Sequence, residues 1–171
     1  MLPEIDVEGQ ESLLKATVLI IGLGGLGSPV SLYLAASGIG SLVLADHDIV
    51  EKSNLQRQIV HTTNSIGTPK ALSAKSTLES INPDISIRAI TEKLTLPALE
   101  QEIQAADIVV DCTDNFETRY AINNACLRTK TKLVSGAAIR MEGQLMAIDP
   151  ANPKSPCYQC LYHSPTQTAA N

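Results

Sequence analysis

Four glycines at a defined spacing are the first residues in this chain that could do chemistry. They lie in the run "VLIIGLGGLGSPVSLYLAASG", which holds Gly22, Gly24, Gly25 and Gly27 between an apolar stretch and a segment of helical spacing. This G-x-G-x-x-G pattern lets a chain turn sharply and approach a ligand closely, and free N–H groups at the following helix start attract an anion. Glycines can also serve a tight strand-to-helix turn without a ligand, so other residues must decide between the two.

An acid follows at the distance that a nucleotide site requires. Asp46 ends the second apolar run, about 20 residues after the last glycine. Its carboxylate can accept hydrogen bonds from the hydroxyl groups of a ribose. The glycines and Asp46 together predict a nucleotide site, but they do not separate NAD from ATP.

Further polar and charged residues follow the second apolar run. Asn54, Gln56, Arg57 and Lys70 all lie within residues 46–70, where the carboxyl end of a strand would open onto a ligand site. Two fixed cations near a nucleotide suit phosphate, above all phosphate whose charge grows in a transition state. An arginine can bind two phosphate oxygens at once. A single Arg or Lys on a loop is usually a solvated surface charge, so the combination carries the inference.

The string "DCTDN" ends the fourth expected strand and supplies a candidate metal ligand. Asp114 stands at that strand end, where its carboxylate could hold Mg2+. Asn115 follows it and is suited to cap the next helix.

These residues need a scaffold of alternating strands and helices. Short apolar runs predict strands over 17–21, 41–45, 85–90, 107–111 and 132–136. Helical spacing occupies 25–37, 67–81, 96–105 and 115–129, and an amphipathic helix precedes the first strand at 7–15. The order predicts an α/β fold: a Rossmann-like, doubly wound, mostly parallel sheet. The alternation in "IRMEGQLMAID" adds a C-terminal strand to a single domain over residues 1–171, and the pattern leaves a parallel or an antiparallel direction open.

Size and composition exclude several classes of protein. The chain has 171 residues, 44% hydrophobic and 18% charged, with a net charge of -5. That charge argues against a nucleic-acid partner. No apolar run approaches the ~20 residues of a membrane span, and "MLPEIDVEGQ" lacks the pattern of a signal peptide. We therefore expect a cytoplasmic protein without a membrane partner, whose four cysteines are reduced, metal-bound or catalytic.

Five strings carry a resemblance to a known family. "GLGGLG", "SNLQRQ", G-x-PK, "DCTDN" and "SGAAIRMEGQ" together resemble the ThiF/MoeB/HesA adenylyltransferases, bacterial relatives of the ubiquitin-activating enzymes, and most of all the MoeB type. The resemblance covers essentially the whole chain. It implies a homodimeric enzyme that uses ATP and Mg2+ to adenylate the C-terminal Gly-Gly carboxylate of a ubiquitin-like sulfur-carrier protein. That carrier would be of the MoaD type in molybdopterin biosynthesis, the ThiS type in thiamine biosynthesis, or a related one.

The resemblance also implies roles for individual residues. Asp46 would hold the ribose, Gly25 would lie against the nucleotide, and Asp114 would position Mg2+ or the α-phosphate. The implied catalytic residues are Arg57, Lys70 and Asp114. The implied ATP-binding residues are Gly22, Gly24, Gly25, Gly27, Asp46, Ser53, Asn54, Leu55, Gln56, Arg57, Lys70, Asp114 and Asn115.

The cysteines divide into two groups. Cys157 and Cys160 form a CxxC pair, which the resemblance implies to be half of a structural Zn2+ site. Such a site needs four ligands, and His163 is a conceivable third. A redox pair and plain loop cysteines are the alternatives. Small buried side chains are expected for Cys112 and Cys126, and surface or capping positions for His47 and His61.

The ends of the chain bear on its activity. Relatives carry an "R-Y-x-R-Q" stretch before the position where this sequence opens, and a second CxxC after the position where it stops. The sequence is therefore expected to be a truncated domain of doubtful activity. Two alternatives remain open: an inactive nucleotide-binding or dimerisation module, and an NAD(P)-dependent oxidoreductase on the same fold.

Overall fold

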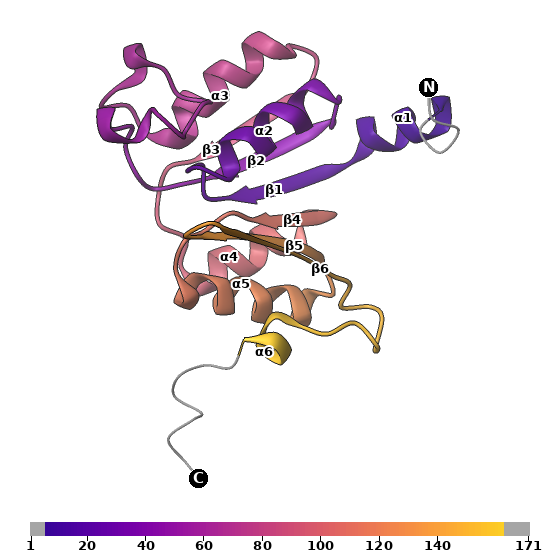
Figure 1. The fold of residues 1–171 in the computed structure, drawn as a ribbon. Helices are drawn as coiled ribbons and strands as arrows, with labels where there is room; N and C mark the ends of the chain where they lie inside the picture. Colours follow the sequence, from indigo (N-terminus) through magenta and orange to yellow (C-terminus); the bar gives the residue numbers. More distant parts are fainter. Residues whose placement is uncertain (1–5, 163–171) are drawn as a thin grey trace.

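A six-stranded sheet with the order β3-β2-β1-β4-β5-β6 forms the centre of the computed structural model, which describes residues 6–162 (Figure 1). Five strands are parallel, and β6 is antiparallel to β5. The strands are β1 Thr17–Ile21, β2 Ser41–Ala45, β3 Ser86–Ile90, β4 Ile108–Asp111, β5 Lys132–Ile139 and β6 Glu142–Ile148. The predicted α/β class, the doubly wound parallel sheet and the added strand are confirmed.

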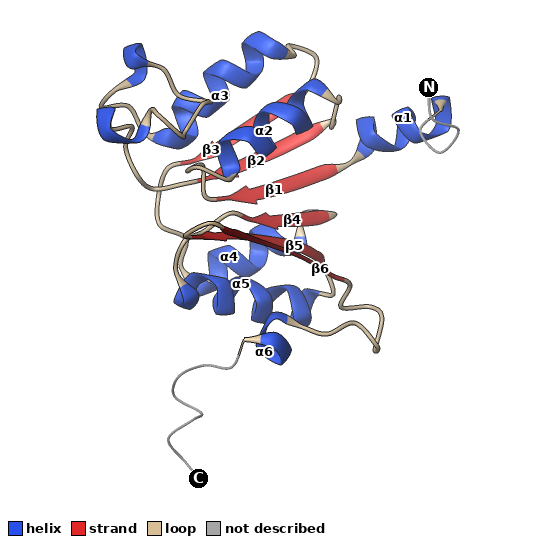
Figure 2. Ribbon diagram, viewed as in Figure 1, coloured by secondary structure: helices blue, strands red, loops and turns tan. Residues whose placement is uncertain are grey.

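Helices cover both faces of this sheet (Figure 2), with α2 and α3 on one side and α4 and α5 on the other. The helices are α1 Val7–Lys15, α2 Gly27–Ala36, α3 Lys70–Ile81, α4 Leu96–Gln104, α5 Phe116–Thr129 and α6 Tyr158–Leu161. In the part of the chain that the structure describes, no helix combines the length and the apolar character needed to cross a membrane.

The alternation of side chains along β1 explains why its sequence is apolar throughout. Val18 and Ile20 pack into the core beneath α2 and α3, whereas Leu19 and Ile21 pack into the core beneath α4 and α5. A strand buried on both faces must be apolar at every position. Because β1 lies between β2 and β4, the loop that follows it leaves from the middle of the sheet's carboxyl edge.

The predicted boundaries differ from the structure by three residues at two places in the chain, and the other differences are smaller. The helix expected over 67–81 begins at Lys70, because Val50 N–H donates to Thr68 C=O and Lys70 N–H donates to Asp48 C=O, which ties this segment to the chain after β2 instead. Ile139, expected in the added strand, ends β5, and Arg140 follows with a φ of 57° in the turn to β6.

The loop between β1 and α2 is built around two close backbone contacts. Gly22 has a φ of +91°, and a Cβ there would lie 2.9 Å from Cys112 O after β4. A Cβ on Gly27 would lie 1.9 Å from Gly22 O. The glycines therefore permit both the sharp turn and the close approach of α2 to β1, as their spacing predicts.

Gly27→Ala is expected to lower the free energy of unfolding by about 3 kcal/mol, because the methyl group would overlap backbone that has little room to move. Urea denaturation measures the change. Gly143→Ala is the matched control, because nothing lies within 4 Å of a Cβ built there, and its effect should stay within about 0.5 kcal/mol. Equal effects of the two substitutions would contradict this account of the loop.

Candidate functional site

Asp46 joins the end of β2 to the glycine loop, Gly22–Gly27. Its Oδ2 accepts a hydrogen bond of 2.7 Å from Leu23 N–H, and its Oδ1 accepts one of 2.9 Å from Asp48 N–H. A carboxylate has about four acceptor sites, so each oxygen keeps capacity for a ligand hydroxyl. Asp46 thus shapes the loop and remains able to accept hydrogen bonds from a ribose.

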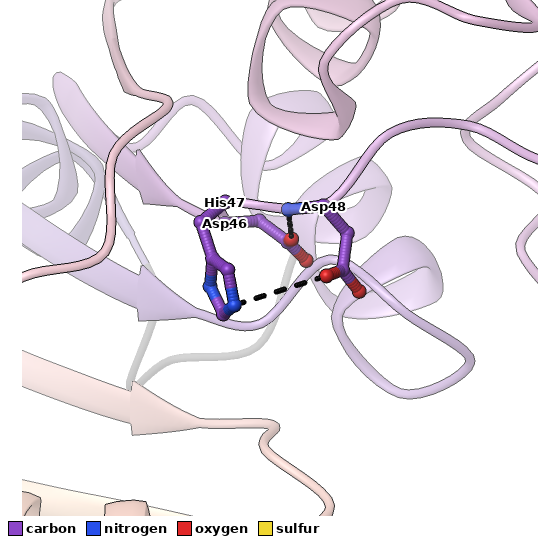
Figure 3. A group of neighbouring side chains, drawn as sticks. All are labelled: Asp46, His47 and Asp48. Atoms are coloured by element: carbon purple, nitrogen blue, oxygen red, sulfur yellow. Dashed lines mark hydrogen bonds and ion pairs between the residues drawn. The ribbon is translucent and has the colours of Figure 1, made fainter.

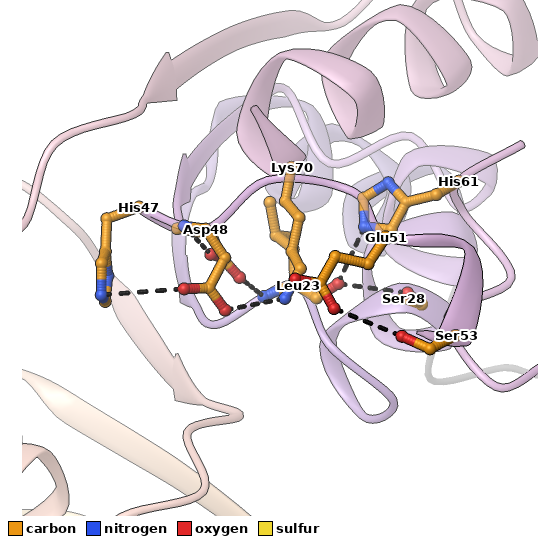
Figure 4. A network of polar contacts seen from close by, with 9 residues as sticks. Leu23, Ser28, His47, Asp48, Glu51, Ser53, His61 and Lys70 are labelled. Carbon is orange, nitrogen blue, oxygen red and sulfur yellow. Dashed lines mark hydrogen bonds and ion pairs between the residues drawn. The ribbon is translucent and has the colours of Figure 1, made fainter. Parts of the chain in front are cut away.

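Lys70 lies at the start of α3, and its ammonium group is held by Asp48. The Nζ–Oδ2 distance is 2.8 Å, and the residue Lys70 is only 5% exposed (Figure 4). The hydrogen bond from Lys70 lowers the pKa of Asp48 against the opposing effect of burial. Sequence reasoning missed Asp48. The signal that could have identified it is an acidic residue shortly after the end of a predicted strand, where ligand-site residues are expected.

A cavity of about 170 Å³ opens beside this ion pair and is lined by Asp48, Ile49, Glu51, Asn54 and Lys70. Asn54 ends a short 3-10 helix, Lys52–Asn54. The cavity therefore brings together two residues of the "SNLQRQ" and G-x-PK strings, which lie well apart in the sequence.

Arg57 lies against the glycine loop from the other direction. Its Cδ is 3.5 Å from the position of a Cβ built on Gly25. The side chain is exposed beyond that contact, so the guanidinium group is free to bind an anion at the loop. Two other predicted residues of this segment form hydrogen bonds within it: Ser53 donates to Glu51, and Gln56 donates to the carbonyl group of Ser53. Leu55 is half-buried.

The loop after β4 carries Asp114 and is fixed by two buried residues. Asp111 accepts hydrogen bonds from the N–H and hydroxyl groups of Thr113, and Arg119 donates from Nε to the carbonyl group of Thr113 at 3.1 Å. Asp114 itself is exposed. Asn115 caps α5, because its Oδ1 accepts the N–H of Thr118 at 2.9 Å. The predicted capping role of Asn115 is confirmed, and its side-chain oxygen keeps one lone pair for a further partner.

Comparison with known proteins places the whole chain in one group. A family model described as the ThiF family matches residues 1–171. The chain is 48% identical over 162 residues to "Sulfur carrier protein ThiS adenylyltransferase" of Escherichia coli (strain K12), covering 95% of this chain and 64% of that protein. It is 47% identical over 170 residues to "Adenylyltransferase and sulfurtransferase MOCS3" of Arabidopsis thaliana, covering 99% of this chain and 36% of that protein.

The chain belongs to the ThiF family. Its fold agrees with a crystal structure of Escherichia coli MccB with ATP, at a TM-score of 0.80 and 30% identity, over 88% of this chain and 46% of that one. The chain thus spans 64% or less of the curated relatives named above. The sequence-based resemblance to the ThiF/MoeB group is confirmed.

A histidine that contacts the glycine loop does not lie where sequence reasoning predicted. His61 was expected at the surface or at a helix cap, but it is 5% exposed, and both of its ring nitrogens form hydrogen bonds. Burial lowers its pKa below the usual value, and the carbonyl group of Leu23 opposes this shift. Gln58, also unassigned from the sequence, is 3% exposed beside Gly24, and its Oε1 has no hydrogen-bond partner in residues 6–162.

Three neighbouring side chains could at first sight hold a metal ion. The ligand atoms of Asp46, His47 and Asp48 lie within 4.8 Å of one another (Figure 3). Asp46 already accepts hydrogen bonds from Leu23 and Asp48, and Asp48 is paired with Lys70. We therefore assign Asp46 and Asp48 to positioning the loop and the lysine rather than to a metal.

The cysteines of this ThiF-family chain fall into two groups. Cys126 is buried as expected, whereas Cys112 is only half-buried. Cys157 is the N-cap residue of α6 and Cys160 lies within that helix, with the two sulfur atoms 3.2 Å apart. Burial raises the pKa of Cys157, but hydrogen bonds from Cys160 and its neighbours outweigh this and keep the pKa below its usual value. Burial raises the pKa of the half-buried Cys112 and the buried Cys126 to about 12, so both are poor nucleophiles. His163 lies outside the described residues.

Asp48→Ala is expected to destabilise the fold more than Lys70→Met. The first substitution leaves a buried ammonium group without its carboxylate, at a cost of roughly 2 kcal/mol, whereas the second leaves Asp48, whose side chain is 57% exposed, in contact with water. Urea denaturation at pH 7 measures both variants. The reverse order would show that Lys70 is held chiefly by other groups.

The same pair predicts how stability depends on pH. Because the pKa of Asp48 is lower in the folded protein than its usual 3.8, the unfolded chain binds more protons as the pH falls through this range. The stabilisation by the pair should be complete above pH 3.8 and decline below it. The difference in stability between wild type and Lys70→Met, measured from pH 7 to pH 3, should therefore shrink only at the acid end. A constant difference would contradict the assignment.

Proposed function

We propose that this chain binds ATP with Mg2+ and catalyses adenylation of the C-terminal carboxylate of a ubiquitin-like sulfur-carrier protein. The observation that carries the proposal is that two cations are tied to the glycine loop. Arg57 lies against Gly25. Lys70 is linked to Leu23 through the hydrogen bonds of Asp48 and Asp46. The relatives support the same reaction class, since one is named as an adenylyltransferase of the carrier ThiS and another as an adenylyltransferase and sulfurtransferase.

The proposed roles follow from the geometry. Asp46 accepts hydrogen bonds from the ribose, and the amide groups of the glycine loop face the phosphates. Arg57 binds phosphate oxygens from above Gly25, while Lys70 does so from the cavity that it shares with Asn54. Asp48 holds the lysine in place but leaves two of its three N–H donors for a ligand.

The proposed reaction requires that the carboxylate be aligned with the α-phosphorus and that the charge on the phosphates be neutralised. A terminal carboxylate is ionised at pH 7, so it can attack the α-phosphorus without a general base. A bond forms between the carboxylate oxygen and phosphorus, the bond to the bridging oxygen of the β-phosphate breaks, and pyrophosphate leaves. Fixed cations stabilise the charge that develops on the phosphate oxygens. This accounts for a site built from Arg57, Lys70 and a metal-binding acid.

Asp114 is the residue that we propose to hold Mg2+. Its exposed carboxylate follows β4, whose end abuts the glycine loop. Mg2+ commonly binds through one or two carboxylates together with substrate phosphates, so this donor set fits the ion. The ion would neutralise phosphate charge when bound.

We also propose a structural Zn2+ ion and a homodimeric enzyme. Cys157 and Cys160, with sulfur atoms side by side, would supply two of the four ligands of a structural Zn2+ ion. The enzyme would act as a homodimer on a carrier of the ThiS or MoaD type. An NAD(P)-dependent oxidoreductase is not favoured, since the named relatives are adenylyltransferases.

Arg57→Ala is expected to reduce the rate of ATP–pyrophosphate exchange in the presence of a sulfur carrier by about 10²- to 10³-fold, because it removes one fixed donor to the developing charge. Lys52→Ala is the matched control, since Lys52 is an exposed lysine on the same segment and has no assigned role. Its exchange rate should remain that of the wild type.

Two results would contradict the proposal. The first is wild-type exchange by Arg57→Ala when thermal denaturation shows both variants folded. The second is failure of the wild-type chain to exchange pyrophosphate with any sulfur carrier of the ThiS or MoaD type. The latter result would favour the alternative of a nucleotide-binding or dimerisation module.

A further inference from the structure

We infer that His61 is a positioning residue of the nucleotide site, which holds the glycine loop in register with the helix that carries Lys70. This inference rests on the proposed function for its effect on ATP. The structural part can be tested without any ligand. His61 lies outside the residues assigned above to nucleotide contacts.

The hydrogen bonds of His61 reach two separate elements. Its Nε2 is 3.1 Å from the carbonyl oxygen of Leu23 in the glycine loop, and its Nδ1 is 3.0 Å from Ser73 Oγ on α3 (Figure 4 shows the contact with Leu23). The carbonyl oxygen can only accept, so Nε2 carries the proton. In the neutral ring Nδ1 then accepts from the hydroxyl group of Ser73. The directions of both hydrogen bonds are thereby fixed.

The peptide groups on either side of Leu23 are consequently held by two different residues. Asp46 accepts from the Leu23 N–H at 2.7 Å, and His61 donates to the Leu23 carbonyl group, which also accepts from Ser28 Oγ at the longer distance of 3.3 Å. One side of the loop is thus tied to the end of β2 and the other to the segment before α3. A loop held on both sides keeps its amide groups aimed before a ligand arrives.

The link to Lys70 runs along α3. Ser73 lies three residues after Lys70 on that helix, so the two residues are neighbours on the helix surface. A shift of α3 would move the ammonium group of Lys70 and break the contact between Ser73 and His61 together. His61 therefore sets the distance between the two parts of the site that would bind phosphate.

Charge explains why this position suits a neutral ring. Lys70 disfavours the protonated form of His61, and Asp46 favours it, while burial is the largest influence and lowers the pKa of the ring. A second positive charge beside Lys70 would also compete for the same carboxylates. His61 thus contributes geometry to the site and leaves the charge to Lys70.

The test uses His61→Phe, which keeps a ring of similar size but removes both nitrogens, and His61→Gln, whose amide can still donate to Leu23. Thr77→Val is the matched control. Thr77 also donates from α3 to backbone carbonyl groups, those of Val60 at 2.8 Å and Ser73 at 3.2 Å, but neither carbonyl group belongs to the glycine loop and neither contact involves the His61 ring. All variants are compared in the full chain at pH 7.5.

The first measurement is amide hydrogen exchange without nucleotide. His61→Phe should speed exchange in residues 22–28 by about tenfold, the equivalent of one lost hydrogen bond. His61→Gln should recover most of the protection, and Thr77→Val should leave this segment unchanged. Equal exchange in this segment for His61→Phe and Thr77→Val would overturn the inference. If His61→Phe does not fold, Ser73→Ala takes its place, with loss of protection in the same segment as the expected result.

The second measurement is the KM for ATP and the kcat of pyrophosphate exchange. His61→Phe should raise KM by about tenfold with a smaller change in kcat, because a misplaced loop weakens binding in the ground state and the transition state alike. An unchanged KM with a loosened loop would overturn the role in nucleotide binding. Loop protection that depends on His61 in a wild-type chain without exchange activity would instead refute the proposed function and leave the structural inference standing.

Discussion

The hydrogen bond from Leu23 N–H to the carboxylate of Asp46 is the interaction on which the site depends. It joins the residue that follows β2 to the loop that follows β1. Parallel strands bring their carboxyl ends to the same edge of a sheet, but they do not by themselves fix the loops that leave them. A charged acceptor and a backbone donor at 2.7 Å do so strongly. Asp46 consequently fixes the loop, and its remaining acceptor sites are the ones that we propose for a ribose.

The electrostatics of the site follow from where its charges are buried. The chain as a whole carries a net charge of -5, which would repel an anionic nucleotide at long range. The site counters this locally, with Lys70 buried at the start of α3 and Arg57 over the glycine loop. Asp48 stabilises the buried lysine, but its negative charge offsets part of the positive charge of the ammonium group. The amide groups of the loop and the metal that we propose at Asp114 would then supply the remaining stabilisation of the phosphate charge.

Much of this arrangement could be predicted from the sequence, because it depends on local patterns. The spacing of the glycines determines the turn, as Gly22 and Gly27 show, and the end of an apolar run locates Asp46. What could not be predicted are contacts between residues distant in the chain. His61 and Leu23 are 38 residues apart, and Lys70 and Asp48 are 22 apart. No periodicity encodes these pairs, and a histidine in a polar stretch resembles a surface residue until the packing of α3 against the loop is known. The start of α3 was misplaced for the same reason, since distant backbone hydrogen bonds hold Thr68 outside the helix.

The protonation states in the site agree with the reaction that we propose, which needs no proton transfer. Enzymes that use a general base generally keep a group whose pKa lies near the working pH. Here the buried histidine, His61, has a lowered pKa and uses both nitrogens to hold neighbouring groups. The thiol of Cys112, next to the loop that carries Asp114, has a pKa raised to about 12 by burial and is therefore uncharged and unreactive. Lys70 is fixed by an ion pair, and Arg57 is permanently charged. A carboxylate that attacks phosphorus is already ionised, so a site of fixed charges suits it better than a site of titrating groups.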